Sequence, residues 1–132
     1  MKDLDRLPDS EVVYRARRSK KCIDEDTGET SPQAYFLRKI DGKLEEGLSV
    51  CLASKCKPEE CCSHFNKRYG VVSLEVSYIR SLGLEVLPDP LPEAPEHALI
   101  INVPDPYNDA TAIKAEFIAG GLAKHSKLEC DK

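Results

Sequence analysis

The chain has 132 residues, of which 41% are hydrophobic and 32% are charged, as expected for one globular domain with its own core. Its 19 basic and 23 acidic residues give a formal net charge of -4, so the overall field disfavours nucleic acid as a partner. The sequence shows neither the apolar core of a signal peptide nor an apolar run long enough for a membrane helix. We therefore expect a cytoplasmic protein with no membrane partner.

The first third of the chain predicts a strand, a charged loop and a short helix. Residues 11–16 alternate apolar and polar side chains, as a strand does. Residues 17–31 hold a basic run followed by an acidic, glycine-containing run, which is typical of a loop. Ser31 is a good N-cap and is followed by proline, so we expect a short helix over residues 32–40.

Further strands and helices follow in alternation. The alternating segment 48–53 predicts a second strand, and residues 58–69 predict a helix with acidic residues in its first turn. Residues 71–76 predict a third strand, a helical turn lies in residues 78–83, and residues 84–87 predict a fourth strand.

The last third begins with a proline-rich connector over residues 88–95, which we expect to cross the surface. Residues 98–103 predict an apolar strand, and residues 110–119 predict an amphipathic helix with Ile113, Phe117 and Ile118 on its apolar face, stopped or bent by two glycines.

The order of these elements predicts an α+β fold. We expect one domain over residues 1–132, with a mixed sheet of about five strands and three or four helices packed on it. Residues 1–10 and 127–132 are expected to be frayed ends.

Four of the six cysteines lie in the run C-x4-C-x4-C-C-x-H, formed by Cys51, Cys56, Cys61, Cys62 and His64. Such thiols bind a metal, carry out redox chemistry or fill a core. Since the expected strand and helix point Cys51 and Cys61 in different directions, we do not expect the two to meet. Packing thiols are the favoured interpretation, with no cofactor, and a zinc site made by Cys51, Cys56, Cys61 and His64 is the alternative.

The strongest candidate binding residues are basic. Arg15, Arg17 and Arg18 stand at the end of the first strand and could hold a phosphate or an acidic group through bidentate contacts. Tyr35 lies in the following helix, and His97 opens the apolar strand after the connector, where binding residues often gather. We expect these five residues to contact a partner.

The chain lacks a P-loop, a G-x-G-x-x-G turn and a nucleophile elbow, which are the commonest nucleotide and hydrolase motifs. This absence favours a non-catalytic module. The expected role is therefore binding or regulation through another protein, with the oligomeric state left open.

Short ordered motifs in residues 11–103 suggest a resemblance to a known group of proteins. They are VYR, SPQAYF, GLSV, YGVVSLEV, SLG, DP and HALI. In this order the chain resembles a group of small bacterial proteins with no assigned activity, so the resemblance implies no catalytic residues.

The order of elements also resembles that of ADP-ribosyltransferase-like toxin domains. That family places an Arg or His on an early strand, a Ser on a later strand and a Glu further on, around NAD. The resemblance implies those roles for Arg15, Ser49 and Glu75, although the chain has no Glu-x-Glu loop. An NAD-using enzyme or toxin domain is thus the first alternative to a binding module, and a small zinc-binding protein that uses the Cys51–His64 cluster is the second.

Overall fold

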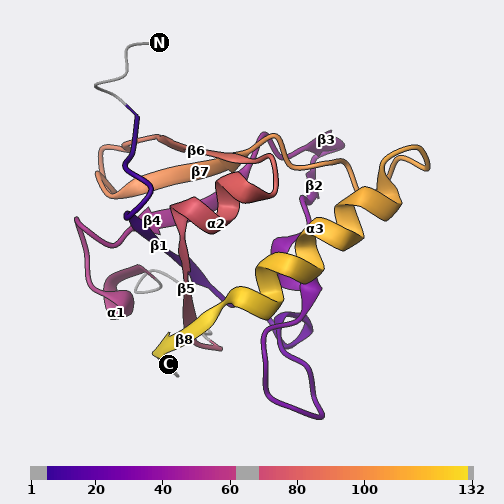
Figure 1. Ribbon diagram of the computed structural model, residues 1–132, viewed down its shortest axis with the longest axis horizontal. Helices are drawn as coiled ribbons and strands as arrows, with labels where there is room; N and C mark the ends of the chain where they lie inside the picture. The colour runs from indigo at the N-terminus through magenta and orange to yellow at the C-terminus, as the bar shows by residue number, and fades with distance from the viewer. Residues whose placement is uncertain (1–5, 62–68, 131–132) are drawn as a thin grey trace.

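An antiparallel sheet built around β1 (Val12–Ala16) organises the protein (Figure 1). The structure is a computed structural model, and it describes residues 6–61 and 69–130. In this part of the chain the main sheet has six strands. In sheet order they are β6 (Glu85–Pro88), β7 (His97–Ile101), β4 (Leu48–Leu52), β1, β5 (Val71–Glu75) and β8 (Lys127–Cys130).

The register of the central strands separates the sheet into two different faces. Val13 pairs with Leu52 on one side and Leu74 on the other, and all three side chains are buried in the main core. The next residue, Tyr14, pairs with Cys51, so both of these side chains leave the sheet on the opposite face. Alternation along β1 therefore gives the protein an apolar core face and a back face that carries thiols.

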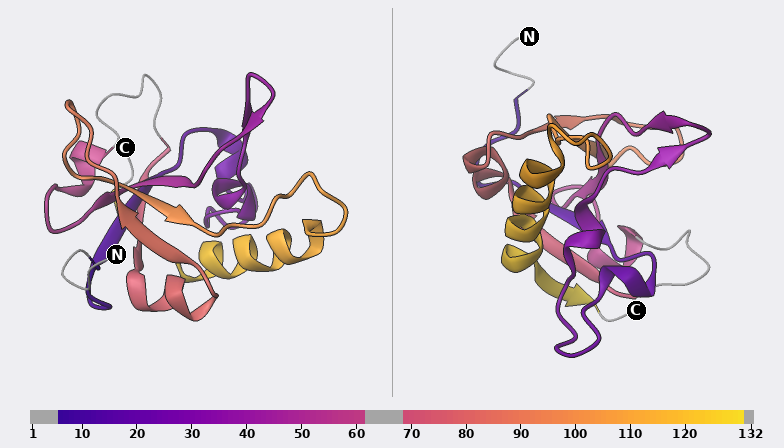
Figure 2. Two further views of the ribbon diagram at one scale, coloured as in Figure 1. Left: turned by 90° about the horizontal axis from the view of Figure 1, so that it is seen from above. Right: turned by 90° about the vertical axis from the view of Figure 1, so that its right-hand side faces the viewer.

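Helices cover the core face. The long helix α3 (Ala112–His125) and the short helix α2 (Val76–Ser81) lie on this side together with the 3-10 helix η3 (Pro32–Tyr35) (Figures 1 and 2). Helix α1 (Pro58–Cys61) lies against the back face, where Cys61 packs with Cys51. The helix predicted for residues 58–69 is described only up to Cys61, and its remainder falls outside the described residues.

The predicted α+β class is confirmed, but the sheet differs from the expected one. Every strand pair among the described residues is antiparallel, so the sheet is not mixed. The extra strand is β8, which lies within the stretch expected to fray. It pairs with β5 through Val72 and Leu128, and Ser73 Oγ donates to a Glu129 carboxylate oxygen 2.7 Å away. These pairings hold a polar segment that is too short to predict from its pattern.

A small hairpin replaces the second half of the predicted helix over residues 32–40. Ser31 caps η3 as predicted, since its Oγ accepts a hydrogen bond from the N–H of Gln33 at 3.2 Å. The chain then forms β2 (Lys39–Ile40) and β3 (Lys43–Leu44), joined by Asp41 and Gly42. Both turn residues have positive φ, as a tight hairpin turn requires.

Helix α3 buries a different face from the predicted one. Ile118 is buried as expected, but Ile113 and Phe117 are exposed, and alanines with Leu122 form the rest of the buried face. The helix also runs straight through its two glycines. A Cβ on Gly121 would lie 2.8 Å from the Tyr78 hydroxyl oxygen, so glycine here permits close contact between α2 and α3 instead of ending the helix.

The proline-rich connector 88–95 makes a turn in which Leu91 and Ala94 form an isolated bridge. None of the helices in residues 6–61 and 69–130 has the length and apolar character needed to cross a membrane.

Candidate functional site

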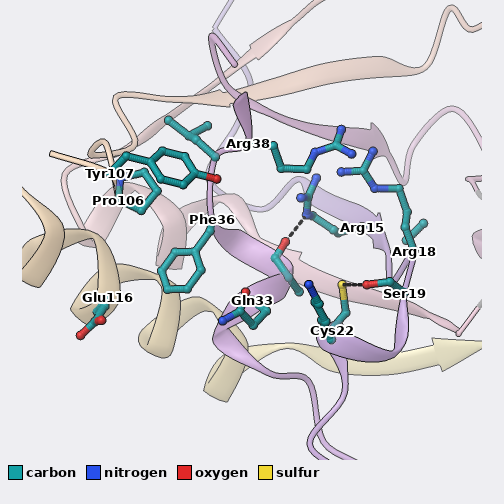
Figure 3. A pocket seen from close by; sticks show the side chains of 14 residues that line it. Arg15, Arg18, Ser19, Cys22, Gln33, Phe36, Arg38, Pro106, Tyr107 and Glu116 are labelled. Carbon is teal, nitrogen blue, oxygen red and sulfur yellow. Dashed lines mark hydrogen bonds between the residues drawn. The ribbon is translucent and has the colours of Figure 1, made fainter. Parts of the chain in front are cut away.

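A cavity of about 590 Å³ opens where β1 ends, between η3 and the loop that precedes α3 (Figure 3). We call it the arginine cleft. Its principal lining side chains are Arg15, Arg18, Lys21 and Arg38, which are basic, and Phe36 and Tyr107, which are aromatic. The carboxylate of Glu116 on α3 lies at its other side. The cleft is therefore strongly basic although the whole chain is acidic.

Arg15 is the most deeply buried cation of the cleft, with 6% of its surface exposed. Its Nε donates to the Ala34 carbonyl oxygen at 2.8 Å, and its Nη1 donates to the Ser49 carbonyl oxygen at 2.7 Å. The guanidinium carbon lies 5.7 Å from the centre of the Tyr35 ring. Burial lowers the pKa of Arg15, because it removes the charged guanidinium from water, and the charge of Arg38 adds to this effect.

Two further guanidinium groups converge with Arg15. Figure 3 shows the ends of Arg15, Arg18 and Arg38 directed toward one another. Burial lowers the pKa of Arg18, and the charges of Arg15 and Arg38 lower it further. Like charges held together in this way are stabilised by an anion placed among them.

Glu45 is the acidic residue that holds Arg38. Its carboxylate oxygens lie 3.1 and 3.2 Å from the Nη2 and Nε atoms of Arg38, and one also accepts from the Arg38 backbone N–H at 2.7 Å. Burial raises the pKa of Glu45, but the hydrogen bonds and charge of Arg38 outweigh this effect, so the pKa is lowered overall. Glu45 therefore stays ionised and orients Arg38 from outside the cleft lining.

An apolar surface continues from the cleft along α3. The Tyr107 ring lies 4.9 Å from the ammonium group of Lys39, which links the preceding loop to the β2–β3 hairpin. On α3, Ile113 and Phe117 are 80% and 75% exposed and lie one helical turn apart. Glu116, which lines the cleft, follows Ile113 by three positions on α3, so these two side chains are neighbours on the helix surface. A basic cleft and an exposed apolar ridge thus adjoin.

The predicted contact residues do not all lie in the cleft. Arg17 is buried, and its Nε donates to the Tyr69 carbonyl oxygen at 2.7 Å. It lines a different cavity of about 380 Å³ together with residues such as Gly28, whose carbonyl oxygen accepts from Arg17 Nη1 at 3.3 Å. The structure therefore separates Arg17 from Arg15 and Arg18.

Tyr35 was expected to contact a partner, and its burial corrects this. Only 1% of its surface is exposed, and its hydroxyl group is hydrogen-bonded to Ser126 Oγ. Burial raises the pKa of Tyr35 to about 12. Tyr35 therefore belongs to the core beneath Arg15. Its ring and its hydroxyl group hold η3 against the C-terminal end of α3.

His97 lies in a third cavity, of about 500 Å³, which we call the cysteine pocket. It is lined by Arg15, Arg18, Ser49, Cys51, Glu60, Cys61, Glu93, Glu96 and His97, among others. His97 is the direct cross-strand partner of Cys51, and its Nδ1 lies 3.1 Å from an Asp89 carboxylate oxygen and 3.0 Å from the Asp89 carbonyl oxygen. Since both oxygens only accept, Nδ1 carries the proton.

The residues suggested by the toxin-domain resemblance come together only in part. Arg15 and Ser49 line the same cavity and are hydrogen-bonded through the Ser49 carbonyl. Glu75 is exposed and pairs with Val12 at the start of β1, whereas Arg15 lies near its end. The structure thus places Glu75 apart from the other two.

The cysteines are arranged differently from our expectation. Cys51 and Cys61 do meet, and their sulfur atoms are 2.8 Å apart. The contact arises because α1 lies across the back face of the sheet. Alternation within β4 could not predict this contact. In the part of the chain that the structure describes, no three His, Cys, Asp or Glu side chains are arranged to hold a metal. Cys62 and His64 lie outside the described residues.

Sequence reasoning did not identify Arg38, Phe36 and Tyr107 as members of a site. The Asp-Gly pair was the available signal for the hairpin that carries Arg38 to the cleft. Tyr107 lies 92 residues after Arg15 in sequence, and only the packing of α3 against η3 brings their segments together.

Comparisons with protein-family models, with curated proteins and with solved structures found no match for this chain. The two resemblances suggested by its motifs therefore stay predictions, and its function has to be inferred from the chemistry of its cavities.

Proposed function

We propose that the protein is a non-catalytic binding module whose arginine cleft takes an anionic group carried by a partner protein. The convergence of Arg15, Arg18 and Arg38 on one cavity carries this proposal. A guanidinium group offers forked donors that match a carboxylate or a phosphate, and three of them can surround such a group.

The surface next to the cleft favours a protein segment over a small free anion as the ligand. Ile113 and Phe117 expose apolar side chains that would bury surface against a partner. The expected ligand is an extended segment that places an acidic or phosphorylated residue in the cleft and an apolar residue on this ridge.

The polar groups of the cleft support binding without catalysis. Ser19 and Cys22 line the cavity, but the Ser19 oxygen and Cys22 sulfur contact each other at 3.9 Å. Among the described residues, Arg15, Arg18 and Arg38 surround this part of the cleft, and an arginine cannot act as a general base near neutral pH.

Calorimetric titration with three short peptides tests the proposal. One contains Glu next to Phe, the second carries phosphoserine in place of Glu, and the third carries Gln. We expect the first or second to bind, with affinity falling as salt rises, and the third to bind at least about tenfold more weakly. The stronger of the two charged peptides identifies a carboxylate or a phosphate as the preferred group.

Matched variants locate the binding. Arg18→Gln and Arg38→Gln should each weaken the charged peptide about tenfold, whereas Arg6→Gln, which removes an exposed charge outside the cleft, should leave affinity unchanged. Equal binding of the neutral peptide, or an equal loss in Arg6→Gln, would contradict the proposal. Turnover of NAD by the purified protein would show that the module is an enzyme.

A further inference from the structure

Two thiols from different elements meet at the back face of the sheet. Cys51 lies on β4 and Cys61 ends α1, and their sulfur atoms are 2.8 Å apart. A disulfide bond is about 2.05 Å long, so a shift of less than 1 Å would bring the two atoms to bonding distance. The Cys61 sulfur also lies 3.5 Å from the Tyr14 carbonyl oxygen, so its shorter contact is with Cys51.

The environment of this pair favours charge on Cys51. The hydrogen bond from Cys61, together with a weaker effect of a hydrogen bond from Cys56, lowers the pKa of Cys51. Burial and the charge of Glu96 act in the opposite direction but do not cancel this lowering. Burial raises the pKa of the neighbouring Cys56 to about 12, and the charge of Cys51 contributes to this effect. Cys61 donates the hydrogen bond to Cys51, and Cys56 keeps its proton more firmly than Cys51 does. Cys51 is therefore favoured as the thiolate, which is the form that attacks a disulfide.

Both cysteines border the cysteine pocket, which opens to solvent. Cys51 and Cys61 are 8% and 5% exposed, and both line this cavity of about 500 Å³. Its outer lining comes from Leu91, which is 37% exposed, and Glu93 on the proline-rich connector. A small molecule that enters here meets the two thiols at the sheet.

The charges of the pocket select among small molecules. Glu60, Glu93 and Glu96 line it, and Arg15 and Arg18 form the wall shared with the arginine cleft. Glu60 lies on α1, Glu93 on the connector and Glu96 immediately before β7. These carboxylates repel an anionic reagent and favour a neutral or cationic one.

We propose that Cys51 and Cys61 form a dithiol site that exchanges with small neutral or cationic disulfides entering the cysteine pocket. The Cys51 thiolate attacks one sulfur of the reagent, which forms a mixed disulfide and releases one reagent thiolate. The Cys61 sulfur then attacks Cys51, gives up its proton and releases the second reagent thiol. Starting from one thiolate and one thiol, the protein loses two electrons and one proton. The reagent disulfide gains them and leaves as one thiolate and one thiol, and a Cys51–Cys61 bond remains.

Treatment of the reduced protein with cystamine, a cationic disulfide, tests this site. After acid quenching, peptide mapping by mass spectrometry should show a Cys51–Cys61 bond as the first product. Cys61→Ser should stop at a mixed disulfide between Cys51 and cysteamine. The anionic reagent dithiodiglycolate should react more slowly than cystamine, by about tenfold or more at low salt.

Matched cysteine variants and unfolding serve as controls. Cys130→Ser and Cys62→Ser should leave the Cys51–Cys61 product unchanged. In denaturant, the bonds formed by the wild-type chain should be distributed over all six cysteines, and this comparison does not depend on any variant folding. The proposal is overturned if Cys22, Cys62 or Cys130 reacts first, if native and unfolded chains give the same products, or if the purified protein carries a stoichiometric metal that blocks the thiols.

Discussion

The arginine cleft and the cysteine pocket share Arg15 and Arg18 as a common wall, yet their remaining residues give them opposite character. Lys21 and Arg38 make the cleft basic, whereas three carboxylates make the pocket acidic. A net charge of -4 for the whole chain predicts neither environment. The comparison shows that the charge of each site is set by the segments that the fold places beside the end of β1, and not by the net charge of the chain.

The two sites also use their buried groups differently. In the cleft, the buried Arg15 is held by carbonyl oxygens and an aromatic ring, so the protein presents charge that a ligand can compensate. In the pocket, thiols are held by each other, so a reagent would meet chemical reactivity instead of a fixed charge. The following changes separate these properties.

Replacing Arg15 should have the largest effect on stability, because this buried residue lines both the arginine cleft and the cysteine pocket. In Arg15→Met the carbonyl oxygens of Ala34 and Ser49 lose their donors inside the protein. We expect the free energy of unfolding, measured in urea, to fall by about 2–4 kcal/mol. Arg6→Met is the matched surface control and should change it by less than about 0.5 kcal/mol. An Arg15→Met protein as stable as the wild type would show that the buried charge is not structural.

Tyr35→Phe should change how the free energy of unfolding depends on pH above pH 10. Folding raises the pKa of Tyr35 from 10.0 to about 12, so the neutral phenol stabilises the fold fully below pH 10. That contribution is lost as the pH rises from 10 through 12, and it is on the order of 2 kcal/mol. Wild-type stability should therefore fall more steeply than that of Tyr35→Phe in this range, as measured by urea unfolding. Parallel pH profiles would contradict the assignment.

Changes at Arg38 and Glu45 should affect the cleft alone. Glu45 competes with a ligand for Arg38, so Glu45→Gln should tighten the charged peptide several-fold, while Arg38→Gln weakens it about tenfold. The rate of cystamine exchange at Cys51 should stay the same in both variants. A parallel change in thiol chemistry would mean that the two sites are coupled.

The smallest effect on stability is expected on the apolar ridge of α3. Phe117 is 75% exposed, so Phe117→Ser should change the free energy of unfolding by no more than about 0.5 kcal/mol. It should nevertheless weaken the phenylalanine-containing peptide about threefold while leaving inorganic phosphate binding unchanged. Leu128→Ser removes another exposed apolar side chain outside the cleft and is the control. An equal loss of affinity in both variants would remove the ridge from the site.

Much of the fold could be predicted because its signals are local. Alternation and apolar runs identified β1, β4, β5 and β7, and the Ser31 cap identified the start of η3. Pairing with a distant strand, which no local pattern encodes, makes β8 a strand. The buried face of α3 was wrongly predicted because alanines fill it while the larger Ile113 and Phe117 face solvent.

The site was harder to predict than the fold. Arg15 and Arg18 were candidates because they are adjacent charges at a strand end, but Arg38 reaches them only through a hairpin and Tyr107 only through the packing of α3. Tyr35 shows the opposite problem, since an aromatic residue beside a basic patch turned out to be core. Tertiary contacts decide the roles of these residues, and local sequence patterns do not predict such contacts.

The most direct measurement of the central claim is an NMR titration that follows the Nε–H resonances of the arginine side chains as the charged peptide is added. Anion binding in the arginine cleft predicts that the resonances of Arg15, Arg18 and Arg38 move together and saturate. Those of Arg6 and Arg80, which both form ion pairs with Glu85 and do not line the cleft, should stay in place. Unmoved resonances in the cleft, or equal shifts at Arg6 and Arg80, would contradict it.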